Sequence, residues 1–206
     1  MFAKSVETVA SSICRNDSMT FFRVVDNPAV GDLWFPDEPL SEDGLEIDSR
    51  EFTQGRPYVG PPPCRVPLAQ QGRPTEFTLA AFDMPIISQR VGRMLDDFCH
   101  AGIQRFPVAV GPFSSGYEIL NVTSTCLCID EQKSEILRWT DEDRRPDKLG
   151  TYRMITNLTI DASRVVGEHI FRVRGWEIAL IVSDDVRTAI EGTCDLGVLF
   201  EAVSSP

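Results

Sequence analysis

The chain has 206 residues, a hydrophobic share of 42%, a formal net charge of −11 and a pI near 4.6. This composition supports one large or two small folded domains, excludes a disordered chain, and argues against direct nucleic-acid binding, which requires basic patches. No run approaches the roughly 18 apolar residues of a membrane span. Glu7 interrupts the apolar residues near the N-terminus, so we predict a cytoplasmic protein without a signal peptide.

The first 76 residues predict little regular structure. Residues 20–25 are rich in β-formers and predict a strand. Residues 37–51 then carry seven acidic side chains and one basic side chain, a net charge of −6 that is over half of the total. The segment 55–74 follows with six prolines and three glycines, a density that is incompatible with a helix or a central strand. We expect residues 1–76 to form an irregular, Pro/Gly-rich and acidic region that packs on a body formed by residues 77–206.

Two interpretations of the proline-rich segment stay open. Pro61–Pro63 together with Pro67 is similar to a polyproline ligand of the SH3 type. Alternatively, the segment is a structural loop whose apolar side chains, such as Tyr58 and Val66, hold it on the surface of the body.

From Phe77 onward, the sequence predicts an α+β body in which short strands outnumber helices. Residues 117–122 alternate between polar and apolar and predict a strand, and residues 126–130 and 152–160 predict two more. The polar and charged residues 131–150 predict a loop.

Two segments of the body have the same pattern of an apolar strand, a serine-capped helix, a glycine and a second short strand. Residues 84–95 align with residues 179–190, so that Ser88 matches Ser183. Each serine follows an apolar strand and precedes a helical pattern, which is typical of a helix N-cap. The second strands run over residues 102–110 and 197–203. These two units predict either an internal duplication or two chance occurrences of a common motif.

The two closing strands predict part of the core. Residues 170–173 and 178–182 are apolar and flank the turn at Gly175 and Trp176. Alternate side chains of a strand share one face. The side chains expected in the core are Phe171, Ile178, Leu180, Val182 and Phe200.

No catalytic or metal-binding pattern is evident. The two histidines, His100 and His169, lie far apart and have no acid or cysteine at ligand spacing. Cys126 and Cys128 lack a second ligand pair, so we interpret them as ordinary reduced thiols. The glycines of residues 111–116 are followed by no lysine, so they predict a turn and not a phosphate loop. We therefore predict no cofactor, no metal site and no enzymatic activity.

Residues 77–203 resemble a family of bacterial polymorphic-toxin immunity proteins, first described from a myxobacterial protein and long known as a domain of unknown function. The resemblance depends on the order and spacing of several short motifs, while the first 75 residues match only in being irregular. The matching motifs are residues 85–88, 106–108, 117–122, 128–130, Ser134, residues 158–161, 169–172, 180–183 and 197–201.

The resemblance implies that the chain binds a cognate toxin of the producing cell and neutralises it without catalysis. A basic toxin would be attracted to the acidic segment, because complementary charge speeds association. The candidate toxin-binding residues are Glu38, Glu42, Asp43, Glu46 and Asp48.

Two alternatives come from other classes of protein: an enzyme with an unfamiliar site near His169, or a scaffold subunit that docks through its proline-rich segment. The sequence predicts no membrane contact and leaves the oligomeric state open.

Overall fold

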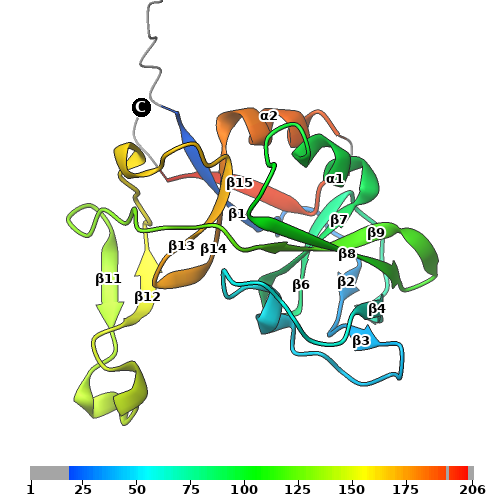
Figure 1. Ribbon diagram of the computed structural model, residues 1–206, viewed down its shortest axis with the longest axis horizontal. Helices are drawn as coiled ribbons and strands as arrows, with labels where there is room; N and C mark the ends of the chain where they lie inside the picture. Colours follow the sequence, from blue (N-terminus) through cyan, green and yellow to red (C-terminus); the bar gives the residue numbers. More distant parts are fainter. Residues whose placement is uncertain (1–18, 194, 204–206) are drawn as a thin grey trace, which may run out of the picture.

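The computed structural model describes residues 19–193 and 195–203, and Figure 1 shows their arrangement. This part of the chain contains two α-helices and fifteen strands. The strands form two large sheets and two small ones. The fold is therefore α+β with strands outnumbering helices, as the sequence predicts.

The larger sheet has six strands in the order β3-β4-β8-β9-β7-β6. The long hairpin of β8 and β9 forms its centre, with Ile103 opposite Val122. Neighbouring strands are antiparallel, except that β4 and β8 are parallel. The strands are β3 (Leu40–Ser41), β4 (Pro63–Val66), β6 (Phe77–Ala80), β7 (Met84–Ser88), β8 (Ile103–Val110) and β9 (Phe113–Val122).

The second sheet has five strands in the order β10-β13-β14-β1-β15. Strand β1 lies between two C-terminal strands and is antiparallel to both, with Phe22 opposite Val182 and Val24 opposite Phe200. The N-terminal region therefore contributes a strand to the interior of this sheet. The strands are β1 (Phe21–Asp26), β10 (Thr125–Cys126), β13 (Ile170–Val173), β14 (Trp176–Ser183) and β15 (Val198–Ala202).

Two short strand pairs complete the structure. Strand β2 (Phe35–Pro36) pairs with β5 (Leu68–Gln70). Strands β11 (Glu135–Arg138) and β12 (Tyr152–Thr156) form a ribbon that projects from the rest of the molecule, with the loop 139–151 at its tip (Figure 1).

The two helices begin at the serines that the sequence predicts as N-caps. The Ser88 hydroxyl accepts a hydrogen bond from the Val91 amide at 3.2 Å, at the start of α1 (Gln89–Leu95). The Ser183 hydroxyl accepts one from the Val186 amide at 3.3 Å, at the start of α2 (Asp184–Glu191). These bonds satisfy amides that have no partner within the helix.

Both helices cover the junction between the two large sheets and contact each other (Figure 1). Their apolar faces and side chains from both sheets form one continuous core, so the two sheets are held together by shared burial. This core contains Val24, Phe77, Leu79, Ile87, Val91, Leu95, Leu120, Val122, Ile170, Leu180, Val182, Val186, Ile190 and Val198.

The face of each sheet that the helices leave open is covered by a largely irregular segment that also contains short strands. Residues 34–68 cover the six-stranded sheet, where Trp34, Ile47 and Phe52 are buried against it. Residues 128–165 cover the five-stranded sheet, where Ile155 and Ile160 are buried. The proline-rich segment is thus part of a core-covering wrap, as one of its two interpretations expects.

The two serine-capped helices join strands in the same way. Helix α1 connects β7 to β8, and the antiparallel strand β9 lies between them. Helix α2 connects β14 to β15, and the antiparallel strand β1 lies between them. In each case the strand before the helix also pairs with the strand that precedes it, β6 or β13.

Three sequence-based expectations about the N-terminal and middle segments were wrong. Residues 63–66 form an interior strand, which is possible because Pro63 is its first residue. Residues 135–138 form β11, a short alternating strand within the charged segment that was expected to be a loop. Residues 126–130 form a strand only at Cys126, and Ile129 makes an isolated bridge with Ile160 before the chain turns at Asp130.

The core prediction was correct for Phe171, Leu180 and Val182 and wrong for Ile178, whose side chain is 41% exposed. Ile178 shares a face with Leu180 and Val182, but it lies near the turn after β13, beyond the residues of β1 that pair with β14. Phe200 is partly buried against the shared core.

Candidate interaction surfaces

The five acidic residues proposed from the sequence lie in one segment but differ in their roles. The Ser49 amide donates a hydrogen bond to Glu38 Oε2 at 2.6 Å. Asp48 caps the 3₁₀ turn Ser49–Phe52 and accepts from the Arg50 amide at 2.9 Å and from Arg50 Nε at 2.8 Å. The Arg50 side chain holds the pKa of the Asp48 carboxyl below its usual value. Glu38 and Asp48 therefore stabilise the local fold.

The other three acids, Glu42, Asp43 and Glu46, are exposed on the turn that follows β3. Gly44, with φ +77°, and a hydrogen bond from the Leu45 amide to the Ser41 hydroxyl shape this turn. Among the residues that the structure describes, none of the three carboxylates forms a hydrogen bond or an ion pair. Their charge is consequently presented to solvent.

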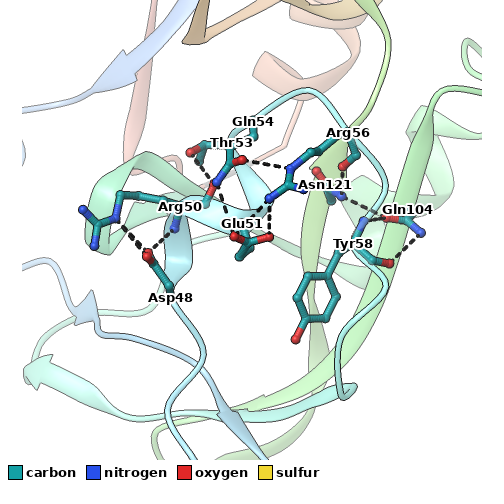
Figure 2. A network of polar contacts seen from close by, with 9 residues as sticks. All are labelled: Asp48, Arg50, Glu51, Thr53, Gln54, Arg56, Tyr58, Gln104 and Asn121. Atoms are coloured by element: carbon teal, nitrogen blue, oxygen red, sulfur yellow. Dashed lines mark hydrogen bonds and ion pairs between the residues drawn. The ribbon is translucent and has the colours of Figure 1, made fainter. Parts of the chain in front are cut away.

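A polar network fixes the segment that follows the acidic residues, as Figure 2 shows. The buried Asn121 side chain of β9 donates to the Arg56 carbonyl at 3.0 Å and to Gln104 Oε1 at 2.9 Å. Gln104 of β8 also accepts from the Tyr58 amide at 2.8 Å and donates to the Tyr58 carbonyl at 3.3 Å. Arg56 pairs with Glu51 at 2.9 Å. Residues 48–58 are thus attached to the central hairpin by hydrogen bonds at defined positions.

A buried arginine holds the same segment against the second sheet. Arg172 of β13 is fully buried and donates to the carbonyls of Glu177 at 2.9 Å and Phe52 at 3.2 Å. Burial lowers the pKa of its guanidinium to about 10. Within the described residues, Arg172 forms no ion pair, but the nearby Asp83 and Glu177 carboxylates partly compensate its charge together with these carbonyl dipoles.

A groove of about 530 Å³ lies where the 48–58 segment meets the β13–β14 turn. Arg50, Thr53 and Gln54 line one side, residues 175–178 line the other, and Phe82 completes the wall. We call this surface the junction groove. It brings together residues that are more than 100 positions apart in the sequence, so no local pattern could have predicted it.

The wall of the junction groove contains an exposed aromatic ring on a strained backbone. Phe82 is 52% exposed, and the Arg50 guanidinium lies over its ring, 4.6 Å from the centroid. Both Phe82 and Asp83 have positive φ, at 55° and 58°, a conformation that costs free energy for residues other than glycine. The surrounding structure therefore holds this ring outward against a local backbone preference.

His169 has a structural environment. Its Nδ1 lies 3.0 Å from the Ser183 hydroxyl and 3.9 Å from Asp185 Oδ2, and its ring packs on Phe98. Ser183 is fully buried, and its hydroxyl already caps α2. Glu76 occupies the corresponding place in the first unit, where its carboxylate accepts a hydrogen bond from the capping Ser88. His169 thus serves as a second hydrogen-bond partner of a helix cap.

The four cysteines in the described part of the chain have no ligand-like grouping. Burial raises the pKa of the Cys126 thiol to about 11 and that of the Cys128 thiol to about 12, so both are protonated at neutral pH. Across residues 19–193 and 195–203, no three His, Cys, Asp or Glu side chains gather closely enough to hold a metal ion. The proline run is also partly hidden, since Pro63 is buried in β4.

The described helices are all too short and too polar to cross a membrane. The model of the Immunity protein family (Imm11) matches residues 31–205. The chain therefore belongs to this immunity protein family, which confirms the resemblance inferred from the sequence motifs. No curated protein is similar enough to the chain to count as a match.

Proposed function

We propose that the chain protects the cell that produces it by binding a cognate bacterial toxin in the cytoplasm and neutralising it without catalysis. The observation that carries this proposal is the match of the immunity protein family to residues 31–205. Binding alone is sufficient for such a role, because a stoichiometric partner can cover the toxin's active surface.

The geometry around His169 supports a non-catalytic role. A Ser–His pair acts as a catalytic nucleophile and base only if the serine oxygen can reach a substrate. Here the Ser183 oxygen is buried and bonded to the Val186 amide. The arrangement satisfies the end of a helix and leaves no accessible nucleophile.

We propose that the acidic segment contributes to the toxin contact and that the toxin is basic. Glu42, Asp43 and Glu46 would face the toxin directly, since they are exposed and their carboxylates have no partner in the described part of the chain. Glu38 and Asp48 would keep the segment in shape through their bonds to residues 49 and 50. Charges of this kind chiefly steer association and have less effect on the lifetime of a complex.

Co-expression tests the proposed function as a whole. The chain and the effector encoded beside its gene are produced in the same cells, and survival is measured with and without the chain. We expect rescue and a complex that survives gel filtration. If the cells die equally fast and no complex forms, the chain is not the immunity protein of that effector.

A charge-matched comparison tests the acidic contact. Changing Glu42, Asp43 and Glu46 to their amides should slow association with the toxin at least about threefold at low salt, and much less at high salt. The control changes Asp97, Asp141 and Glu142, which are equally exposed acids in other segments, to their amides. An equal effect of both sets would show that net charge alone matters and that the acidic segment is not a specific contact.

We also propose that the N-terminal region 1–76 packs on the body 77–206.

We further propose that the two strand–helix–strand units of the body derive from a duplicated ancestor. The shared strand order around each helix and the matching cap positions Ser88 and Ser183 support this origin. Separate profiles of the two units across many family members would align with each other if the units are duplicates.

A further inference from the structure

We infer that the junction groove is the anchor site for a loop of the toxin that carries a large apolar side chain next to a carboxylate. This inference rests on the proposed function and adds to it the place and the chemistry of the tight contact. The acidic segment would bring the toxin to this face, and the groove would hold it.

The apolar half of the site comes from Phe82, Trp176 and Ile178. Phe82 and Ile178 are 52% and 41% exposed, although they are the kinds of side chain that usually pack inside a protein. Both line the same groove with Trp176, so the exposed apolar surface is concave and shared between two distant segments. Interface residues that dominate binding are typically aromatic or arginine side chains in such pockets.

The charged half of the site comes from Arg50. Its Nε is occupied by Asp48 at 2.8 Å, and its terminal nitrogens have no hydrogen-bond partner among the described residues. The side chain is 59% exposed, and its guanidinium lies over the Phe82 ring. A planar guanidinium fixed in this way presents a pair of N–H donors that matches a carboxylate.

Two arginines lie at the groove among several carboxylates, and they differ in how far they remain available to a ligand. The buried Arg172 lies directly behind the groove wall, where it donates to the Glu177 and Ile178 carbonyls and forms no ion pair with any described residue. The Glu177 carboxylate, the acid that lines the groove, accepts a hydrogen bond from the Gly175 amide at 2.7 Å. Arg50 is therefore the charged donor that remains available to a ligand.

The backbone of residues 82 and 83 gives an independent reason to assign a role to the groove. Two consecutive residues with left-handed φ cost free energy, and such strain is retained where it positions a functional group. Here it directs the Phe82 ring toward the Arg50 side chain and the groove. The groove is also continuous with the proposed acidic contact, since Asp48 and Arg50 are bonded neighbours (Figure 2).

The test measures binding of purified variants to the effector encoded beside the gene, by surface plasmon resonance. Phe82→Gly removes the ring and relieves the positive φ, so it should leave thermal stability unchanged or raised while weakening binding at least about tenfold. Ile178→Asp should weaken binding by a similar factor. Arg50→Gln should weaken it, and Arg50→Lys should restore only part of the loss.

The control is Leu137→Asp, which alters an exposed apolar side chain of similar exposure on the projecting ribbon. It should change affinity less than about twofold. The groove variants should increase the dissociation rate, whereas the amide variants of the acidic segment should reduce the association rate.

The two proposals can fail separately. If the wild-type chain does not bind the effector, the proposed function and the groove assignment both fall. If the wild-type chain binds and the folded Phe82→Gly and Ile178→Asp variants bind equally well, the groove assignment is wrong and the immunity function stands. If both groove variants weaken binding but Arg50→Gln does not, the inferred carboxylate is wrong.

Discussion

At the scale of single residues, the helix caps could be predicted and the junction groove could not. Ser88 and Ser183 were identifiable because a cap depends on residues within three positions of itself. Phe82 and Ile178 line a groove only because the fold brings residues 50–54 beside them, and nothing near them in the sequence indicates that arrangement. Ile178 was accordingly expected in the core, where its alternation with Leu180 places it.

We expect Ser183→Ala to reduce the free energy of unfolding by about 1–2 kcal/mol. The substitution leaves the Val186 amide without its capping partner and removes the hydroxyl that bonds His169 Nδ1. Urea unfolding followed by circular dichroism measures the change. Ser115→Ala, at an exposed position in β9, is the control and should have no effect. Equal stability of both variants would mean that the cap contributes nothing.

The buried Cys128 thiol predicts a loss of stability at alkaline pH. Burial raises the pKa of this thiol from 9.0 to about 12, so the folded protein keeps a proton that the unfolded chain releases above pH 9. The resulting stabilisation is complete below pH 9 and is lost as pH rises from 9 to 12. Between pH 9 and 10 the expected loss is about 1 kcal/mol from this thiol alone.

Unfolding in urea under reducing conditions, repeated at pH 8, 9 and 10, measures this loss. Cys128→Ala should decline less steeply than the wild type over this range, whatever its absolute stability. Cys64→Ala is the matched control, since it removes an exposed thiol in place of a buried one. Parallel slopes for all three proteins would show that Cys128 is not the titrating group.

At the scale of elements, strands with a strong apolar pattern of their own were predicted well. Strands that depend on pairing with a strand distant in the sequence were not. Residues 170–173 were expected as a strand with the bounds that β13 has. Strand β4 exists because β8 lies beside it, since Arg65 and Val66 pair with Ala109 and Val110. Its own composition, with a proline at its start, gave no reason to expect an interior strand.

Gly55 tests how closely the wrap must approach the second sheet. A Cβ atom at this position would lie 2.5 Å from Thr125 Cγ2, and its φ is +64°. Gly55→Ala should therefore cost about 2–4 kcal/mol, from backbone strain and overpacking together. Gly44→Ala has a similar φ but open space around it, so it should cost only about 1 kcal/mol. Equal costs in thermal unfolding would show that the close approach carries no energy.

At the scale of the whole molecule, the fold class followed from the alternation of short strands with two helices, while the assembly of the sheets did not. The sequence predicted that residues 1–76 pack on the rest of the chain. In the structure this region contributes β1 to the interior of one sheet and β4 to the interior of the other. Such long-range pairing has no local signal, because each partner is chosen by burial that the complete fold provides.

Cutting the chain once between its N-terminal region and the rest tests whether the two parts form a single folded unit. Val59 is 92% exposed in a segment without regular structure, so limited proteolysis should cut there before cutting the sheets. We expect the two fragments to remain together in gel filtration and to separate only in denaturant, because β1, β2 and β3 of the first fragment stay paired with strands of the second. A C-terminal fragment that elutes alone in native buffer would show that the two regions are independent.

The position of β1 also delays the completion of its sheet while the protein is being synthesised. Strand β15, one of the two partners of β1, begins about 170 residues after β1 ends. At typical rates of synthesis of roughly 5–20 residues per second, the ribosome needs about 10–35 s to supply that partner. During this interval Phe21 and Val24, which are buried in the finished fold, belong to an incomplete sheet on a nascent chain. Shielding by chaperones would matter most during this interval. Each new molecule can bind its partner only after β15 has been synthesised and has paired with β1.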